Sequence, residues 1–101
     1  MNIQKTEQNG KVILQLEGWL DTLSSPELAA EVDTIENATE VILDFDKVEY
    51  IASSGIRQVV ACYKRCKEIG AEFSVINTSE ETMSIFELTG IDKKLNISKK
   101  D

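Results

Sequence analysis

Short runs of apolar residues alternate along the chain with segments in which apolar residues recur every three or four positions. The short runs predict strands, and the longer period predicts helices. Residues 2–7 and 11–17 flank Asn9-Gly10, a pair that favours a type I′ hairpin turn because both positions tolerate positive φ. The other predicted strands are 40–45, followed by the segment 48–51, then 73–76 and a short last strand around Leu95 and Ile97.

Two helices are predicted in the first two thirds of the chain. The first has Ser25 as an N-cap hydroxyl and Pro26 in its first turn. The second runs from about Ser54 to Glu68 and ends at Gly70, which easily takes the left-handed conformation of a helix C-cap. The apolar positions of these two helices are Leu28, Val32, Ile35, Ile56, Val59, Val60, Tyr63 and Cys66.

A third helix is predicted between residues 78 and 90. Thr78 and Glu81 have the spacing of a capping box at its start. Its apolar positions before Gly90 are Met83, Phe86 and Leu88. The polar tail that follows the last strand, residues 98–101, is expected to fray.

The order of these elements predicts the fold class. Strands and helices alternate after the first hairpin, which indicates crossover helices and a mixed, mostly parallel sheet with the N-terminal hairpin at its edge. No repeat, low-complexity tract or linker divides the chain, and 101 residues suffice for one core. We therefore expect a single α/β domain over residues 1–101.

Composition excludes several functions. The chain has no histidine, which removes Ser-His-Asp and Cys-His catalysis, histidine metal sites and histidine phosphotransfer. Its 18 acidic and 11 basic residues give a net charge of −7, so no nucleic-acid partner is expected, because phosphates require a basic face. These features favour an acidic binding module over an enzyme.

The expected compartment is the cytoplasm. The N-terminus lacks the apolar stretch of a secretory signal, and the apolar runs fall far short of the ~20 residues of a membrane helix, so no membrane insertion is expected. Cys62 and Cys66 stand at i and i+4 of a predicted helix, where a disulfide would constrain almost nothing. They are interpreted as reduced structural thiols, with a redox pair as the alternative.

The turn from Tyr50 to Gly55 holds the candidate chemistry. Ser53, Ser54 and Gly55 stand between a strand end and a helix start, where ligands gather in α/β folds. A phosphate on Ser53 would be favoured by the helix dipole and would add about −1.5 to −2 charge against any partner on the turn. The alternative is structural: one serine is only an N-cap, and Gly55 only eases the turn.

The same turn resembles the Asp-Ser-Ser/Thr-Gly-Leu signature of the STAS domain family, found in bacterial anti-sigma factor antagonists. Four further segments resemble motifs of that family in the same order along the chain. They are Gly18-Trp19-Leu20-Asp21, the strand 41–45, the helix end 67–71 and the late segment 86–91. The resemblance covers nearly the whole chain and implies a single STAS-like domain.

Partner switching is the function that this resemblance implies. In the family, the unphosphorylated antagonist binds an anti-sigma factor that is also a serine kinase, and the sigma factor is released. The kinase uses its own ATP to phosphorylate the first serine of the motif, here Ser53, and a serine phosphatase reverses the step. This chain would then need no cofactor and no metal. The implied partner surface is Trp19, Asp21, Ala52, Ser53, Ser54, Gly55, Ile56 and Arg57.

Ala52 departs from the family pattern, which usually has an acid immediately before the phosphorylated serine. If the kinase recognises that acid, phosphorylation of Ser53 is slower or absent. Binding without a switch would suit an alternative function, a constitutive scaffold or accessory subunit in a stress-signalling or lipid-transport assembly. A thiol oxidoreductase using Cys62 and Cys66 is disfavoured, because neither cysteine lies at a helix start.

Arg57, Lys64, Arg65 and Lys67 form the dense basic group of this acidic chain, on the helix predicted after the serine turn. One interpretation is a solvated helix face, and the other is that Arg57 and Lys64 steer a partner. Trp19 is likewise interpreted either as a packed or partly exposed aromatic side chain or as part of a partner contact.

Overall fold

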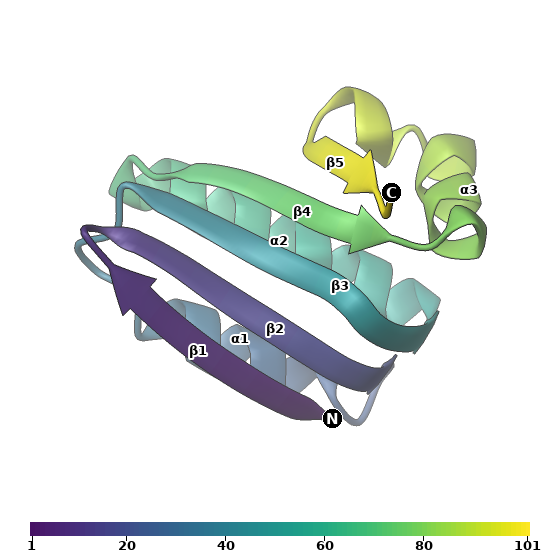
Figure 1. Cartoon of the computed structure of the whole chain (residues 1–101), viewed down its shortest axis with the longest axis horizontal. Helices are drawn as coiled ribbons and strands as arrows, with labels where there is room; N and C mark the ends of the chain where they lie inside the picture. Colours follow the sequence, from purple (N-terminus) through teal and green to yellow (C-terminus); the bar gives the residue numbers. More distant parts are fainter.

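A five-stranded sheet runs through the middle of the computed structural model, which describes all residues from 1 to 101 (Figure 1). The strands are β1 (Asn2–Gln8), β2 (Lys11–Leu20), β3 (Glu40–Ile51), β4 (Glu72–Thr78) and β5 (Asn96–Lys99), and they lie side by side in that order. β1 is antiparallel to β2, and the other neighbours are parallel. The expected mixed, mostly parallel sheet is therefore confirmed.

The hairpin between β1 and β2 turns at Asn9 and Gly10, whose φ angles of 53° and 83° are those that a type I′ turn requires. β2 ends at Leu20 and β3 at Ile51, so each strand leads directly into a segment with predicted functional residues.

The helices occupy one face and one end of this sheet. α1 (Ser25–Asp33) and α2 (Ser53–Ile69) cover the face that points away from the viewer in Figure 1, and α3 (Glu80–Thr89) lies beside the carboxyl end of β4. A 3-10 turn, η1 (Ile91–Lys93), leads from α3 to β5. None of the helices combines the length and the apolar character needed to cross a membrane.

One hydrophobic cluster joins the sheet to the helices. Alternate residues of β2, namely Val12, Leu14 and Leu16, are buried, as expected for a strand with one covered face. Leu28 and Val32 of α1 and Val59, Cys62 and Cys66 of α2 belong to the same cluster. The predicted apolar stripes of α1 and α2 therefore face the core.

Two helix starts differ from the prediction by one residue. The N-cap of α1 is Ser24 and not Ser25, and the N-cap of α3 is Ser79 and not Thr78. The Ser79 hydroxyl accepts from the N–H of Thr82 at 3.2 Å. Thr78 is buried, and its hydroxyl donates to the carbonyl of Ser98 at 2.6 Å. The tertiary contact with β5 thus decides which of two adjacent hydroxyls serves as the cap.

The expectation that Leu88 packs into the core is wrong, because 88% of this residue is exposed. Phe86 is fully buried, and two helical positions rotate a side chain by about 200°, which turns Leu88 away from the sheet.

The expectation that residues 98–101 fray is also wrong as far as Lys100. Ser98 and Lys99 belong to β5, and the N–H of Lys100 donates to the carbonyl of Thr78 at 2.9 Å. The Lys100 ammonium lies 2.6 Å from a carboxylate oxygen of Asp46. Pairing with β4 and this ion pair hold a segment whose composition alone is that of a loose tail.

One interpretation of the basic group was a solvated helix face, and Arg65 does not fit it. Its Nη2 donates to the carbonyl of Ile35 at 3.2 Å and lies 3.4 Å from that of Asp33. These carbonyls lie where α1 ends, and the last carbonyls of a helix lack partners within it and attract cations. Arg65 therefore links α2 to the end of α1.

We predict that Arg65→Ala lowers the free energy of unfolding by about 1–3 kcal/mol, because a charged donor is lost from two carbonyls. Lys64→Ala is the matched control, since Lys64 is the exposed neighbour and its loss should change stability by less than about 0.5 kcal/mol. Urea unfolding followed by circular dichroism measures both values. Equal effects of the two substitutions would contradict the structural role of Arg65.

Candidate functional site

The serine turn joins the end of β3 to the start of α2. Ala52 lies between Ile51 and Ser53, and its N–H donates to the carbonyl of Leu20 at 2.9 Å, which ties the turn to the end of β2. Ala52 is the N-cap of α2 and provides no side-chain cap. The interpretation of Ser53 or Ser54 as the N-cap is therefore wrong.

The two serines have different surroundings. Ser53 is exposed in the first turn of α2, and its hydroxyl makes no hydrogen bond within the protein. Ser54 is half-buried, and its hydroxyl accepts from that of Thr22 at 3.2 Å. Ser53 is thus free to react or to contact a partner, whereas Ser54 holds the loop between β2 and α1 against α2.

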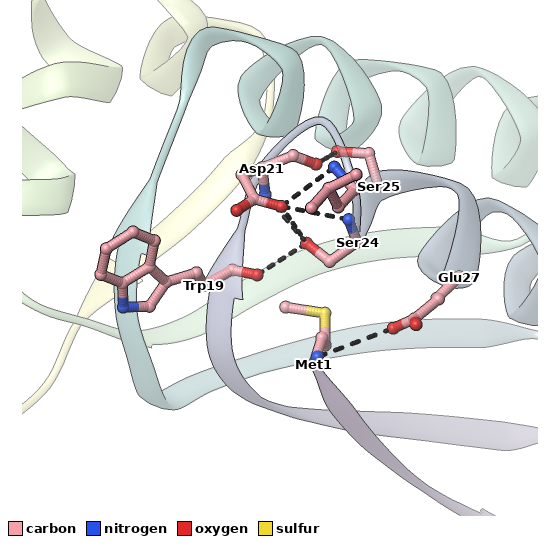
Figure 2. Close-up of polar contacts among 7 residues, drawn as sticks. Met1, Trp19, Asp21, Ser24, Ser25 and Glu27 are labelled. Atoms are coloured by element: carbon pink, nitrogen blue, oxygen red, sulfur yellow. Dashed lines mark hydrogen bonds and ion pairs between the residues drawn. The ribbon is translucent and has the colours of Figure 1, made fainter.

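Asp21 organises that loop, as Figure 2 shows. Its Oδ1 accepts from the N–H groups of Leu23 and Ser24, both at 3.1 Å. The Ser24 hydroxyl accepts from the N–H of Asp21 at 2.9 Å and lies 2.6 Å from the carbonyl of Trp19. The N–H of Ser24 lowers the pKa of Asp21 most, against a smaller opposing effect of desolvation. The ionised carboxylate therefore fixes the loop, and Oδ2 accepts no hydrogen bond.

Gly55 is needed for close packing and not for an unusual backbone angle. A Cβ atom at this position would lie 2.4 Å from the carbonyl oxygen of Leu20 and 2.9 Å from side-chain carbons of Leu20 and Ile51. The residue is buried within α2, at the contact between the helix and the ends of β2 and β3. The interpretation that Gly55 only eases the turn is wrong, because a side chain would push α2 off the sheet.

Ile56 and Arg57 complete the predicted surface. Ile56 is partly buried and packs against the core cluster. Arg57 is exposed and forms no ion pair within the protein. It stands four positions after Ser53, so the two side chains lie on one face of α2.

Trp19 and Tyr50 form an exposed aromatic pair beside the turn. They are partners across β2 and β3, and their ring centroids are 5.3 Å apart at an interplanar angle of 55°. Trp19 is 57% exposed and Tyr50 50%. Because their neighbours Leu20 and Ile51 are buried among the helices, the two rings project to the opposite face of the sheet.

The structure therefore brings Trp19, Asp21 and the segment 52–57 to one end of the molecule, although they come from distant parts of the chain. Thr22 and Leu23 were not predicted to belong to this site, and Tyr50 was predicted to lie in the serine turn but not in the partner surface. Tyr50 is aligned with Trp19 only through two register shifts between β2 and β3, which no local pattern revealed.

The cysteines are poorly placed for redox chemistry. Both lie buried on α2, and burial raises the pKa of Cys62 to about 12 and that of Cys66 to about 11. A reactive thiol needs a lowered pKa and access to solvent. No group of three or more histidine, cysteine, aspartate or glutamate side chains is placed to hold a metal ion.

Comparison with protein families matches residues 2–100 to the STAS domain. The chain belongs to the STAS domain family. It is 25% identical to the anti-sigma-B factor antagonist of Bacillus subtilis in an alignment of 101 positions that covers 99% of this chain and 93% of that protein. The predicted resemblance is therefore confirmed.

Solved structures agree with this STAS fold. An anti-sigma factor antagonist from Mycobacterium paratuberculosis has a TM-score of 0.85 at 20% identity, covering 96% of this chain and 84% of the other. The Bacillus cell fate determinant SpoIIAA in its phosphorylated form has a TM-score of 0.75 at 19% identity, covering 95% and 90%. At these identities the likeness establishes a shared fold.

We predict that Gly55→Ala lowers the free energy of unfolding of this STAS domain by about 2–3 kcal/mol, because overpacking displaces α2 from β2. Ser53→Ala is the control, since it changes an exposed side chain two positions away and should alter stability by less than about 0.5 kcal/mol. Chemical denaturation compares the two. Retained stability of the Gly55→Ala protein would contradict the close contact with Leu20.

A second prediction concerns pH. Because the pKa of Asp21 is lowered in the folded state, the ionised carboxylate stabilises the fold at any pH above its unfolded value of 3.8. This contribution disappears as the pH falls through the lower folded pKa. Asp21→Asn should therefore melt below the wild type at pH 7, with the difference closing in strong acid. Glu36→Gln, at an exposed loop carboxylate without a hydrogen bond, should show no such convergence.

Proposed function

We propose that this STAS domain is an anti-sigma factor antagonist that binds its anti-sigma factor through the surface around Ser53, and that phosphorylation of Ser53 ends the binding. One observation carries the proposal: in the first turn of α2, Ser53 has an exposed hydroxyl that makes no hydrogen bond within the protein. The similarity to antagonists, and to a structure described as phosphorylated, supports it.

The electrostatics of the turn suit a phosphate. The N–H of Ile56 makes the first helical bond, to the carbonyl of Ala52 at 3.0 Å, so the earlier N–H groups have no partner within the helix. The positive end of the helix dipole favours an anion there by about 0.3–1 kcal/mol. Arg57, at the favourable i+4 position, would pair with the phosphate. The modification would thus be tolerated by the fold and would neutralise Arg57.

The same phosphate would act against a bound partner. It adds about −1.5 to −2 charge to a surface that must lose water on binding. It would also engage Arg57, the free cation of the site. Loss of affinity would follow from repulsion and desolvation at this surface, without a change of fold.

The proposed partners are an anti-sigma factor with serine kinase activity and a serine phosphatase, both in the cytoplasm. The kinase would bring the ATP, so this chain would act by binding and would use no cofactor. Ala52 leaves no acid before Ser53, and we therefore expect slower phosphorylation than in a protein with Asp at this position. A constitutive scaffold role is the alternative if the switch is absent.

We predict that Ser53→Asp weakens binding to the purified cognate anti-sigma factor by at least about tenfold, because a charge enters the interface. Ser53→Ala should bind within about threefold of the wild type, since no internal hydrogen bond is lost. Isothermal titration calorimetry measures the dissociation constants. Ser84→Asp, at an exposed position of α3, is the control for charge alone.

Incubation with the kinase and ATP should add one phosphate to the wild type and none to Ser53→Ala, as measured by intact mass. Ala52→Asp should be phosphorylated faster. If the chain binds the anti-sigma factor but Ser53→Asp and Ser53→Ala bind equally, the switch is refuted and the scaffold role is favoured. If the wild type does not bind, the antagonist role itself is refuted.

A further inference from the structure

The strongest feature outside the serine turn is an apolar surface on the adjoining strand ends. Trp19, Tyr50 and Leu23 form it, and we call it the aromatic patch. Leu23 is 87% exposed, and neither aromatic ring belongs to the core cluster. In the free domain these side chains are therefore held largely in water, which is unfavourable for large apolar groups.

The aromatic patch is preorganised. The Trp19 ring contacts that of Tyr50, and the Trp19 backbone carbonyl accepts a hydrogen bond from the Ser24 hydroxyl at 2.6 Å. The backbone of Leu23 is held by the hydrogen bond that its N–H donates to Oδ1 of Asp21 at 3.1 Å. Two aromatic side chains that already contact each other lose less conformational entropy on binding than separate flexible ones, and Trp and Tyr are enriched among residues that dominate binding energy.

The edge of the aromatic patch holds two carboxylates, Asp21 and Glu27, against one amine, that of Met1, and so keeps one net negative charge. A surface pocket of about 370 Å³ is lined by Met1, Trp19, Asp21, Leu23, Ser24 and Glu27. Figure 2 shows the Asp21 and Glu27 carboxylates at this site and the ion pair between the Met1 amine and Glu27. The amine lies 3.8 Å from the Glu27 carboxylate, and one oxygen of Asp21 accepts no hydrogen bond. A second copy of this chain, with net charge −7, would bring the same carboxylates against these. Charge complementarity therefore favours a basic partner over a dimer.

The aromatic patch is connected to the switch residue. Thr22, between Asp21 and Leu23, bonds to Ser54, which is adjacent to Ser53. The N–H of Ala52 bonds to Leu20, which is adjacent to Trp19. A partner that covers Leu23 and Trp19 would therefore border the hydroxyl that we propose is phosphorylated.

We propose that the aromatic patch is the main anchor for the anti-sigma factor, which inserts an apolar side chain flanked by lysine or arginine between Trp19 and Leu23. This inference rests on the proposed function and specifies its contact. The serine turn would then act as the switch, while most of the affinity would come from the neighbouring strand ends.

Calorimetric titration of the purified anti-sigma factor against the full chain tests the proposal. Trp19→Ala should weaken binding by at least about 30-fold, as for a dominant interface residue. Leu88→Ala is the matched control, because Leu88 is as exposed as Leu23 but lies on α3, and it should change the dissociation constant by less than about twofold. Thermal melting verifies that both variants fold.

Charge reversal tests the basic character of the partner. Glu27→Lys should weaken binding by about three- to tenfold, whereas Glu36→Lys, with the same change in net charge in the loop between α1 and β3, should have little effect. Equal effects would overturn the basic contact.

The chain has one tryptophan, so 5-fluorotryptophan gives a single ¹⁹F signal that should shift on binding.

The outcomes separate the two proposals. If the wild type binds but Trp19→Ala binds as tightly, the aromatic patch is overturned as the anchor and the antagonist role stands. If the wild type does not bind the anti-sigma factor, both are overturned. A dimer of the free chain that Trp19→Ala dissociates, seen by analytical ultracentrifugation, would also overturn the anchor.

Discussion

The contact between Gly55 and the end of β2 determines where everything else at this site lies. The carbonyl of Leu20 approaches α2 so closely that no Cβ fits, and the same oxygen accepts the N–H of Ala52. The first turn of α2 therefore packs directly against the end of β2. Because Leu20 stands between Trp19 and Asp21, this one approach places the exposed Ser53 beside both the aromatic patch and the loop organised by Asp21.

The fold places the charged residues in different surroundings. Within the basic group, Arg65 supports the end of α1, Lys67 lies 5.4 Å from the centre of the Tyr63 ring, and Arg57 remains free beside Ser53. The carboxylates of Asp21 and Glu27 edge the aromatic patch instead. The net charge of −7 therefore does not indicate the chemistry of a partner by itself, because that depends on where each charged side chain lies on the folded surface.

Local rules predicted most of the elements, and long-range contacts caused the errors. The hairpin, the central strands and the C-cap at Gly70 depend on neighbours in the sequence, and all are present in the structure. The start of α3 moved by one residue because β5 engages Thr78. The tail at Lys100 is ordered by pairing with β4 and by Asp46, which are far away in the sequence.

The sequence by itself determined the order of strands and helices, the absence of histidine chemistry, and a serine turn at a strand-to-helix junction. These follow from composition and from periodicities that are local. Only the tertiary structure decided that Gly55 is a contact point, that Asp21 holds a loop, and that Trp19 meets Tyr50. Each depends on the register of β2 against β3 and on the seating of α2, which are set by packing between distant segments.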